Sequence, residues 1–327
     1  VVEDTPSVYV YRLKMGDHVQ TGIAGTWSVD EYDRDLIKKH ERTRKDKEDD
    51  RTRHICTLRA QTGPVFLAYR DVPGIDRLVG QVTAGAPLFD FRADDGITHT
   101  LWRVPNPTAL VEAFSAVPAL YIADGHHRAA SASRARASLK EKAGASWTGQ
   151  EDANFFLAVT FPQSQLRILP YHRLVKDLRG QSAEAFLSAL RDKVSVEPTQ
   201  AEAPNGAGSV HMYLAGHWYR LGLKQAGEVI TDPQAALDVS LLQDRVLAPL
   251  LGIDDPRTDK RIDFVGGIRG PQALRQAVDG GKAAVAFSMY PTSLQQLMDI
   301  ADANQIMPPK STWFEPKLRD AIVTHLI

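Results

Sequence analysis

Two apolar runs near the start of the chain, separated by a polar turn, predict a β-hairpin. The first run is Val-Tyr-Val-Tyr-Arg-Leu at residues 8–13, and the second covers residues 19–27. The residues between them include Gly-Asp-His at 16–18, which is typical of a turn. We therefore expect two antiparallel strands at the start of the chain.

A strongly charged segment follows at residues 38–53. It holds eight basic and five acidic side chains in sixteen positions, so it does not belong to a core. It leads into a predicted helix at 51–60. The other elements that the apolar pattern predicts in the first half are strands at 65–69, 88–92, 119–123, 154–161 and 166–174, and helices at 75–82, 107–116 and from 126 to about 142.

The second half begins with a Pro- and Gly-containing stretch, 196–209, that predicts a surface loop. A hairpin at 210–223 and a helix at about 233–251 follow. Strand and helix then alternate, which is typical of an α/β arrangement. The alternating elements are strands at 262–265 and 283–287, and helices at 271–278 and 293–303.

The length of 327 residues exceeds that of an average domain, so we expect two domains. The boundary is predicted between residues 174 and 181, after the last strand of the first half. The domains would then be 1–178 and 179–327. The predicted fold class is α/β, with mixed sheets of the kind found in α+β proteins.

Composition narrows the function classes. Hydrophobic residues are 43% and charged residues 24% of the chain, and the formal net charge is −1. A basic field for nucleic acid is therefore absent, so a nucleic-acid partner is not expected. No apolar run is long enough for a spanning helix, so we expect no membrane association. Cys56 is the only cysteine, which favours the reducing cytoplasm. The chain begins without Met, and we expect a segment upstream of it.

The strongest local pattern is a buried strand followed by Asp-Gly-His-His-Arg at 124–128 and a helix. Backbone N–H groups at a helix N-terminus bind anions, and Gly125 allows close approach. Arg128 adds a bidentate donor, and His126 or His127 adds another. Asp124 could hold Mg²⁺, which takes few carboxylates. The alternative is a structural turn in which Asp124 caps the helix.

Two further segments are candidates. Glu41 lies among basic residues that favour its ionised form, which suits a general base, although such a charge run is also typical of a solvated helix end. The segment Pro309-Lys310-Ser311-Thr312-Trp313 places an ammonium and two hydroxyls together, which suits a carboxylate or phosphate. The alternative interpretation of this segment is a structural arm that packs Trp313 and Phe314 into a groove.

Several standard motifs are absent. The chain has no Gly-x-x-x-x-Gly-Lys-Ser/Thr loop, no Gly-x-Gly-x-x-Gly after a strand, no His-Glu-x-x-His, no Gly-x-Ser-x-Gly and no His-Arg-Asp. The sequence therefore disfavours the P-loop, Rossmann, zincin, α/β-hydrolase and protein-kinase classes.

The segment Ile-Ala-Asp-Gly-His-His-Arg at 122–128 resembles the corresponding segment of the DUF1015 family. This resemblance implies membership of the ParB/sulfiredoxin-like superfamily. The archaeal free-serine kinases are more distant relatives that share four segments in the same order. These are Lys39-His40-Glu41, which is similar to their Pro-His-Glu, the Asp-Gly-His-His-Arg turn, the strand–helix–strand unit at 260–290, and Pro309-Lys310-Ser311-Thr312, which is similar to their Pro-Lys-Thr-Thr.

This resemblance implies a ParB/sulfiredoxin-like nucleotide-binding core with a second, smaller α/β domain. It implies that the His40-Glu41 segment is catalytic with Glu41 as the base, that Asp124 contacts a metal, and that residues 125–128 bind nucleotide phosphates. Lys310, Ser311 and Thr312 would hold the substrate, with Trp313 where the kinases have Arg. The expected cofactors are ATP or ADP, with CTP possible, and Mg²⁺.

We therefore expect a kinase that phosphorylates the hydroxyl of a small molecule such as serine. Its site would lie between the halves, built from Glu41, Asp124 and Lys310. A second hypothesis is a ParB-like nucleotide-binding switch without kinase chemistry; ParB-like DNA binding lacks a helix-turn-helix pattern. A third is a metal-dependent hydrolase that would use the histidines at 40, 54, 126 and 127.

Overall fold

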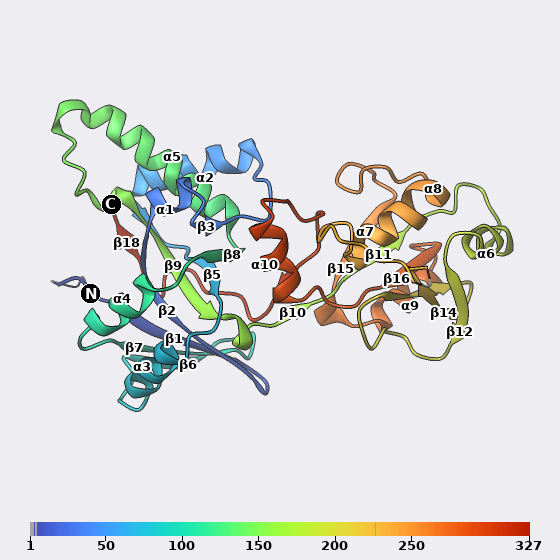
Figure 1. Ribbon diagram of the computed structural model, residues 1–327, viewed down its shortest axis with the longest axis horizontal. Coiled ribbons are helices and arrows are strands. Elements are labelled where there is room, and N and C mark those ends of the chain that lie inside the picture. The colour runs from blue at the N-terminus through green and yellow to red at the C-terminus, as the bar shows by residue number, and fades with distance from the viewer. Residues whose placement is uncertain (1–2, 4, 226) are drawn as a thin grey trace. The chain divides into compact units, whose positions relative to one another are not determined.

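A computed structural model describes residues 3, 5–225 and 227–327. The chain forms two compact units, each with its own main sheet (Figure 1). Unit 1 comprises Val1–Arg167 together with Pro316–Ile327, and unit 2 comprises Ile168–Glu315. The predicted α/β class with mixed sheets is confirmed.

The main sheet of unit 1 has eight strands in the order β3-β8-β5-β9-β2-β1-β7-β6. The predicted hairpin is confirmed: β1 and β2 pair antiparallel, with Met15 opposite His18. The strands are β1 (Tyr9–Met15), β2 (His18–Ser28), β3 (Ile37–Lys38), β5 (Val65–Tyr69), β6 (Phe89–Arg92), β7 (Thr98–Arg103), β8 (Leu120–Asp124) and β9 (Phe155–Pro162). Strand β7, which the sequence did not predict, pairs with both β1 and β6 and so extends this sheet.

The centre of this sheet is mixed. Strand β5 pairs parallel with β9 and antiparallel with β8, while β8 pairs parallel with β3. All five residues of β5 are buried, which is typical of a strand covered on both faces. Strand β8 is buried up to Asp124, so its polar end emerges where the strand stops.

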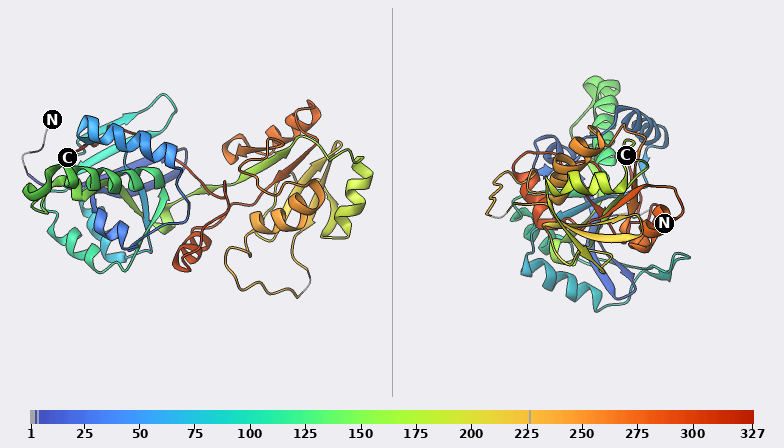
Figure 2. Two further views of the ribbon diagram at one scale, coloured as in Figure 1. Left: turned by 90° about the horizontal axis from the view of Figure 1, so that it is seen from above. Right: turned by 90° about the vertical axis from the view of Figure 1, so that its right-hand side faces the viewer.

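Five α-helices accompany this sheet: α1 (Val29–Asp33), α2 (Lys45–Leu58), α3 (Pro73–Thr83), α4 (Thr108–Ser115) and α5 (His126–Ala143). Residues of α3, α4 and α5 join the strands in one apolar core that includes Ile75, Leu110 and Ala129. Helices α2 and α5 lie side by side (Figures 1 and 2). Helix α2 was predicted to begin at 51 but begins at Lys45, because its charged first turns pair with α5, as Glu48 does with Arg134.

The main sheet of unit 2 has six strands in the order β12-β14-β13-β16-β11-β15, all paired antiparallel. They are β11 (Tyr171–Val175), β12 (Ser195–Thr199), β13 (Ser209–Leu214), β14 (His217–Gly222), β15 (Ile262–Gly266) and β16 (Val285–Ser288). The predicted strand 166–174 is divided, since Pro170 separates β10 (Ile168–Leu169) from β11. The predicted loop 196–209 begins as strand β12, whose edge position tolerates Pro198.

The helices of unit 2 are α6 (Ala183–Arg191), α7 (Asp238–Leu242), a π-helical segment (Gln243–Leu247), α8 (Ala248–Leu251), α9 (Gln272–Asp279) and α10 (Leu294–Asp302). The helix predicted from 233 therefore begins at Asp238 and contains a π-helical interruption. Helix α10 has a capping box, in which Ser293 and Gln296 satisfy each other's backbone N–H groups.

The last twelve residues return to unit 1. Strand β18 (His325–Leu326) pairs antiparallel with β4 (Ala60–Gln61), and the Ala321 N–H donates a hydrogen bond to the Thr62 carbonyl. These units differ from the predicted division at 178: β11 belongs to the sheet of unit 2, and 316–327 belong to unit 1. Within the described ranges, no helix combines the length and apolar character needed to cross a membrane.

Candidate functional site

The turn after β8 is formed by a glycine that has a left-handed backbone. Gly125 has φ 94°, a conformation that costs little only for glycine, and it is the N-cap residue of α5. Asp124 accepts a hydrogen bond from the Gly125 N–H and caps no N–H of the first helical turn. The alternative in which Asp124 is the N-cap is therefore wrong. The first turn of α5 has no side-chain cap.

The two histidines of this turn hold the segment 40–44 against α5. The His40 backbone N–H donates to Nε2 of His126 at 3.4 Å, and the Arg44 N–H donates to Nε2 of His127 at 3.0 Å. His40 also packs edge-on against His126, with ring centroids 4.4 Å apart. The sequence predicted these histidines as phosphate donors; in the structure each accepts a backbone N–H through Nε2.

Burial keeps these imidazoles neutral. It lowers the pKa of His40 to about 4, and it lowers the pKa of His126 well below 6.5, with a further contribution from His40. The pKa of His127 is also lowered, by burial and by the charge of Arg51. Since Nε2 of His126 accepts a hydrogen bond, the neutral ring carries its proton on Nδ1. His40 is only 1% exposed, so it lies behind His126 and does not line a hollow.

Glu41 lies beside the turn, as the sequence predicted when it placed the two segments in one site. Its Oε2 is 3.6 Å from Nδ1 of His126, and its side chain is 43% exposed. Glu41 and the turn line a hollow of about 160 Å³, here called the smaller hollow. Its lining residues are Glu41, Arg51, Asp124, Gly125, His126, His127 and Arg128. Two carboxylates, an uncapped helix start and two guanidinium groups therefore line one small space.

Asp124 is held by a lysine from the end of the chain. Its Oδ2 accepts a hydrogen bond from Nζ of Lys317 at 2.6 Å. Burial alone would raise the pKa of Asp124, but Lys317, Arg128 and the Gly125 N–H together lower it below its usual value. A single ionised carboxylate fits Mg²⁺, which keeps several waters and binds phosphate oxygens. Asp124 therefore fits the predicted metal contact if Lys317 moves aside.

Arg128 is held by two neighbours. It donates to the Pro64 carbonyl at 3.1 Å and pairs with Asp320 at 3.3 Å. Gly63 makes room for this pair, because a Cβ there would lie 2.9 Å from Arg128 Nε and 3.0 Å from Asp320 Oδ1. Asp320 thus pairs with the guanidinium group for which the sequence predicted a phosphate partner.

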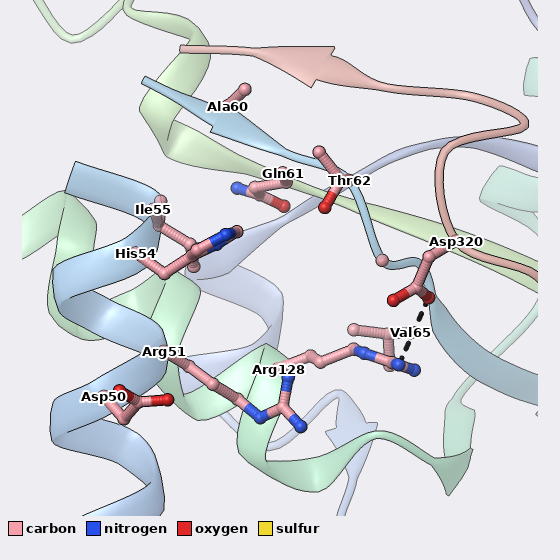
Figure 3. Close-up of a pocket in the computed structure, with 11 residues that line it drawn as sticks. Asp50, Arg51, His54, Ile55, Ala60, Gln61, Thr62, Val65, Arg128 and Asp320 are labelled. Carbon is pink, nitrogen blue, oxygen red and sulfur yellow. Dashed lines mark hydrogen bonds and ion pairs between the residues drawn. The ribbon is translucent and has the colours of Figure 1, made fainter. Parts of the chain in front are cut away.

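A second hollow of about 310 Å³, the larger hollow, adjoins the smaller one. Arg51 and Arg128 line both. Figure 3 shows Arg51 projecting from α2 and Arg128 from α5, with Asp320 at the end of the Arg128 side chain. Among the described residues, Arg51 makes no hydrogen bond or ion pair with a protein group. The lining residues are Asp50, Arg51, His54, Ile55, Ala60, Gln61, Thr62, Gly63, Val65, Arg128 and Asp320.

The predicted substrate segment belongs to unit 2, whereas Glu41 and Asp124 belong to unit 1. Ser311 is buried, and its hydroxyl donates to the Pro308 carbonyl. The Trp313 ring packs against Tyr171, and its Nε1 donates to Glu315. These contacts favour the packed-arm interpretation for Ser311 and Trp313. The substrate role of Lys310 to Trp313 stays a prediction.

The metal-dependent hydrolase hypothesis does not fit. Within the part of the chain that the structure describes, no three His, Cys, Asp or Glu side chains gather in a group that could hold a metal ion. His126 and His127 use Nε2 to accept backbone N–H groups, and His40 is buried behind His126. The four histidines therefore do not form a zinc site.

Sequence reasoning missed Arg51, Lys317 and Asp320. Arg51 is one of eight basic residues in a charged segment, and nothing local distinguishes it from the others. Lys317 and Asp320 reach the turn because the chain returns to unit 1 after Glu315, a path that no local pattern reveals. The only signal was the helical spacing that puts Arg51, His54 and Ile55 on one face of α2.

Comparison with known proteins gives a family. The family model described as "Protein of unknown function (DUF1015)" matches residues 1–240. No curated protein matches the chain. Three solved structures are similar over most of their length. A conserved hypothetical protein from Pyrococcus furiosus is 14% identical, with a TM-score of 0.42 over 91% of this chain and 93% of that one.

A free serine kinase in complex with AMP is 14% identical, with a TM-score of 0.41 over 96% of this chain and 91% of that one. SbnI with a C-terminal truncation, from Staphylococcus aureus, is 11% identical, with a TM-score of 0.46 over 93% of this chain and 87% of that one. The family match covers more than half of the chain and agrees with the resemblance at 122–128. The chain therefore belongs to the DUF1015 family.

Proposed function

We propose that this protein is a nucleotide- and Mg²⁺-dependent phosphotransferase that acts on the hydroxyl of a small metabolite. The observation that carries the proposal is the smaller hollow, in which Glu41 faces the start of α5 together with Arg51 and Arg128. Phosphoryl transfer requires mainly positioning and charge neutralisation, and this hollow contains groups for both. The motif resemblance to the free-serine kinases supports the same reaction.

The phosphates would bind at the start of α5. The uncapped first turn offers the N–H groups of His126 and His127, since those of Gly125 and Arg128 are hydrogen-bonded within the turn. It also offers the positive end of the helix dipole, and Gly125 leaves the approach open. Arg51 offers a guanidinium without a protein partner among the described residues, and Arg128 becomes available when it exchanges Asp320 for a phosphate oxygen. These groups neutralise the charge on the transferred phosphoryl group.

Glu41 would accept the proton of the acceptor hydroxyl. A bond forms between the hydroxyl oxygen and the terminal phosphorus, the bond from that phosphorus to the bridging oxygen breaks, and the proton passes to the Glu41 carboxylate. His126 acts as a positioning residue, because its ring accepts the His40 N–H and directs Nδ1 toward Glu41. His40 supports the His126 ring from behind.

Asp124 would hold the magnesium ion together with the nucleotide phosphates. The bound ion supplies charge neutralisation at the phosphate oxygens. In the structure that carboxylate pairs with the Lys317 ammonium, so the site already accommodates a cation at Asp124. Lys317 would have to release Asp124 for the ion to bind there.

The test is transfer of phosphate from ATP or ADP to a panel of small hydroxy compounds that includes serine, with Mg²⁺, for wild type and Glu41→Gln. We expect a phosphorylated product with wild type and a rate roughly 10²- to 10⁴-fold lower for the variant, with nucleotide affinity preserved. Glu141→Gln is the matched control, because this exposed residue at the far end of α5 should not change the rate.

An unchanged rate in Glu41→Gln would remove Glu41 from the mechanism. Nucleotide binding without any product would instead favour the ParB-like switch. CTP is included for that reason, with assembly state followed by size-exclusion chromatography. Nucleotide-dependent assembly together with no transfer to any acceptor would contradict the kinase proposal.

A further inference from the structure

We infer that the larger hollow binds the nucleoside, base and ribose, of the nucleotide whose phosphates bind at the turn. This inference rests on the proposed function and adds a binding site to it. The two hollows share Arg51 and Arg128, so a ligand that spans both passes these two guanidinium groups. A nucleotide has this form, with a polyanion joined to a larger and less polar end.

The position of Glu41 gives the direction of the ligand. Glu41 lines the smaller hollow and does not line the larger one. The acceptor hydroxyl must reach Glu41, so the terminal phosphate and the acceptor occupy the smaller hollow. The opposite end of the nucleotide then extends past Arg51 and Arg128 into the larger hollow.

The floor of the larger hollow is apolar. Ile55 from α2, Ala60 from β4 and Val65 from β5 line it and are 8%, 7% and 1% exposed. A volume of about 310 Å³ lies at the lower end of the range for organic ligand sites. The small polar acceptor that Glu41 would serve could not cover this floor, whereas a planar base can.

Polar groups surround that floor. Figure 3 shows His54 on α2 and Thr62 on the opposite wall, and both side chains belong to the lining. Asp50 lies one helical turn before His54; its Oδ1 pairs with Arg53 at 2.6 Å, and its Oδ2 can accept a hydrogen bond from a ribose hydroxyl. Gln61 is not a base-reading group, because its amide bonds to the backbone of Phe155 and Leu157. The hollow therefore combines a stacking ring, hydroxyl acceptors and an apolar floor.

The test compares binding of ATP, CTP and inorganic tripolyphosphate by isothermal titration calorimetry, with Mg²⁺ present. The protein carries Glu41→Gln, so that no turnover occurs. We expect the tighter of the two nucleotides to bind at least about tenfold more tightly than tripolyphosphate, because only the nucleotides bury apolar surface. Equal affinity for all three ligands would overturn the inference.

Two variants locate the binding site. Thr62→Tyr fills the larger hollow and should reduce nucleotide affinity to that of tripolyphosphate, while tripolyphosphate affinity stays unchanged. His54→Ala removes an exposed side chain and should reduce the nucleotide preference several-fold without affecting folding. Thr57→Tyr, on an exposed position of α2 outside both hollows, is the control and should bind all ligands as the parent does.

A nucleotide preference that survives both Thr62→Tyr and His54→Ala would contradict the inference and place the base elsewhere. This result is distinguishable from failure of the proposed function. The experiment on the inference measures binding alone, whereas the experiment on the proposed function measures product formation with active Glu41. Nucleotide bound in the larger hollow, with no transfer to any acceptor, would support the inference and contradict the phosphotransferase.

Discussion

Lys317 donates a hydrogen bond to Asp124 across 193 positions of sequence, with Nζ 2.6 Å from Oδ2. Three residues later, Asp320 pairs with Arg128. The C-terminal segment 316–327 therefore places a cation on the carboxylate and a carboxylate on the guanidinium of the same turn. In the proposed reaction, a metal ion and a phosphate would take these two positions. Ligand binding and the contacts of this segment thus compete for the same groups.

The first prediction concerns the strength of the Lys317–Asp124 pair. We expect Lys317→Ala to reduce the free energy of unfolding at pH 7 by at most about 1 kcal/mol, because both side chains are nearly half exposed. Lys317 lowers the folded-state pKa of Asp124, so its contribution is present above the unfolded value of about 4. The difference from wild type should therefore disappear as the pH falls below that value.

Urea denaturation at pH 7 and at several values below pH 4.5 measures this difference. Lys317→Arg is the control, since it retains the charge and should remain close to wild type throughout. If the loss of unfolding free energy in Lys317→Ala does not change with pH, the lysine acts by packing and not through the Asp124 charge.

The second prediction concerns the buried imidazole behind the turn. The folded-state pKa of His40 is about 4, and its unfolded value is about 6.5. Between these values the unfolded chain binds a proton that the folded chain does not, so stability falls as the pH falls from 6.5 to 4. The shift corresponds to about 3 kcal/mol for this residue. His40→Phe should remove this part of the acid sensitivity.

Thermal or urea unfolding from pH 7.5 to 4 tests this expectation. His172→Phe is a useful comparison, because His172 in unit 2 also has a pKa of about 4 from burial, lies outside the turn, and its loss should leave nucleotide binding unchanged. Equal pH dependence in His40→Phe and wild type would mean that folding does not lower the pKa of His40.

The third prediction concerns the turn itself. Gly125→Ala introduces a side chain at φ 94°, with its Cβ 3.4 Å from the Val65 Cα, and should cost about 1–2 kcal/mol of folding free energy. It should also weaken tripolyphosphate binding, because the Cβ obstructs the start of α5. Gly16→Ala, at φ 59° in the β1–β2 turn with open space around it, is the matched control.

Calorimetry and urea denaturation on both variants separate the two effects. If the substitutions act only through backbone strain, both variants lose stability and neither changes its affinity for tripolyphosphate. Unchanged tripolyphosphate affinity in Gly125→Ala would exclude the start of α5 from phosphate binding.

Local patterns predicted the elements whose cause is local. The strand before Asp124 was predictable because its residues are uniformly apolar, and the turn because Gly125 stands between that strand and a helix. Strand β7 was missed because threonines at 98 and 100 interrupt its apolar pattern, and because pairing with β1 and β6 defines it.

The candidate site was only partly predictable for the same reason. The pairing of Glu41 with the turn came from a family resemblance, since 83 positions separate Glu41 from Asp124 and no spacing rule connects them. Lys317 and Asp320 arrive through the return of the chain to unit 1. The neutral state of His126 follows from burial, which depends on how β8, α5 and the segment 40–44 pack together.

The last prediction concerns Arg51, the basic residue that lines both hollows and has no protein partner among the described residues. If it binds phosphate, Arg51→Ala should weaken tripolyphosphate and nucleotide binding by similar factors, on the order of ten- to a hundredfold. The salt dependence of binding should also decrease, because one charge is lost. Lys47→Ala removes the same charge from an exposed position of α2 outside both hollows and serves as the control. Equal losses in Arg51→Ala and Lys47→Ala would indicate a general field effect. A loss confined to Arg51→Ala would indicate direct contact, and its equal size for tripolyphosphate and nucleotide would place that contact on the phosphates and not on the base.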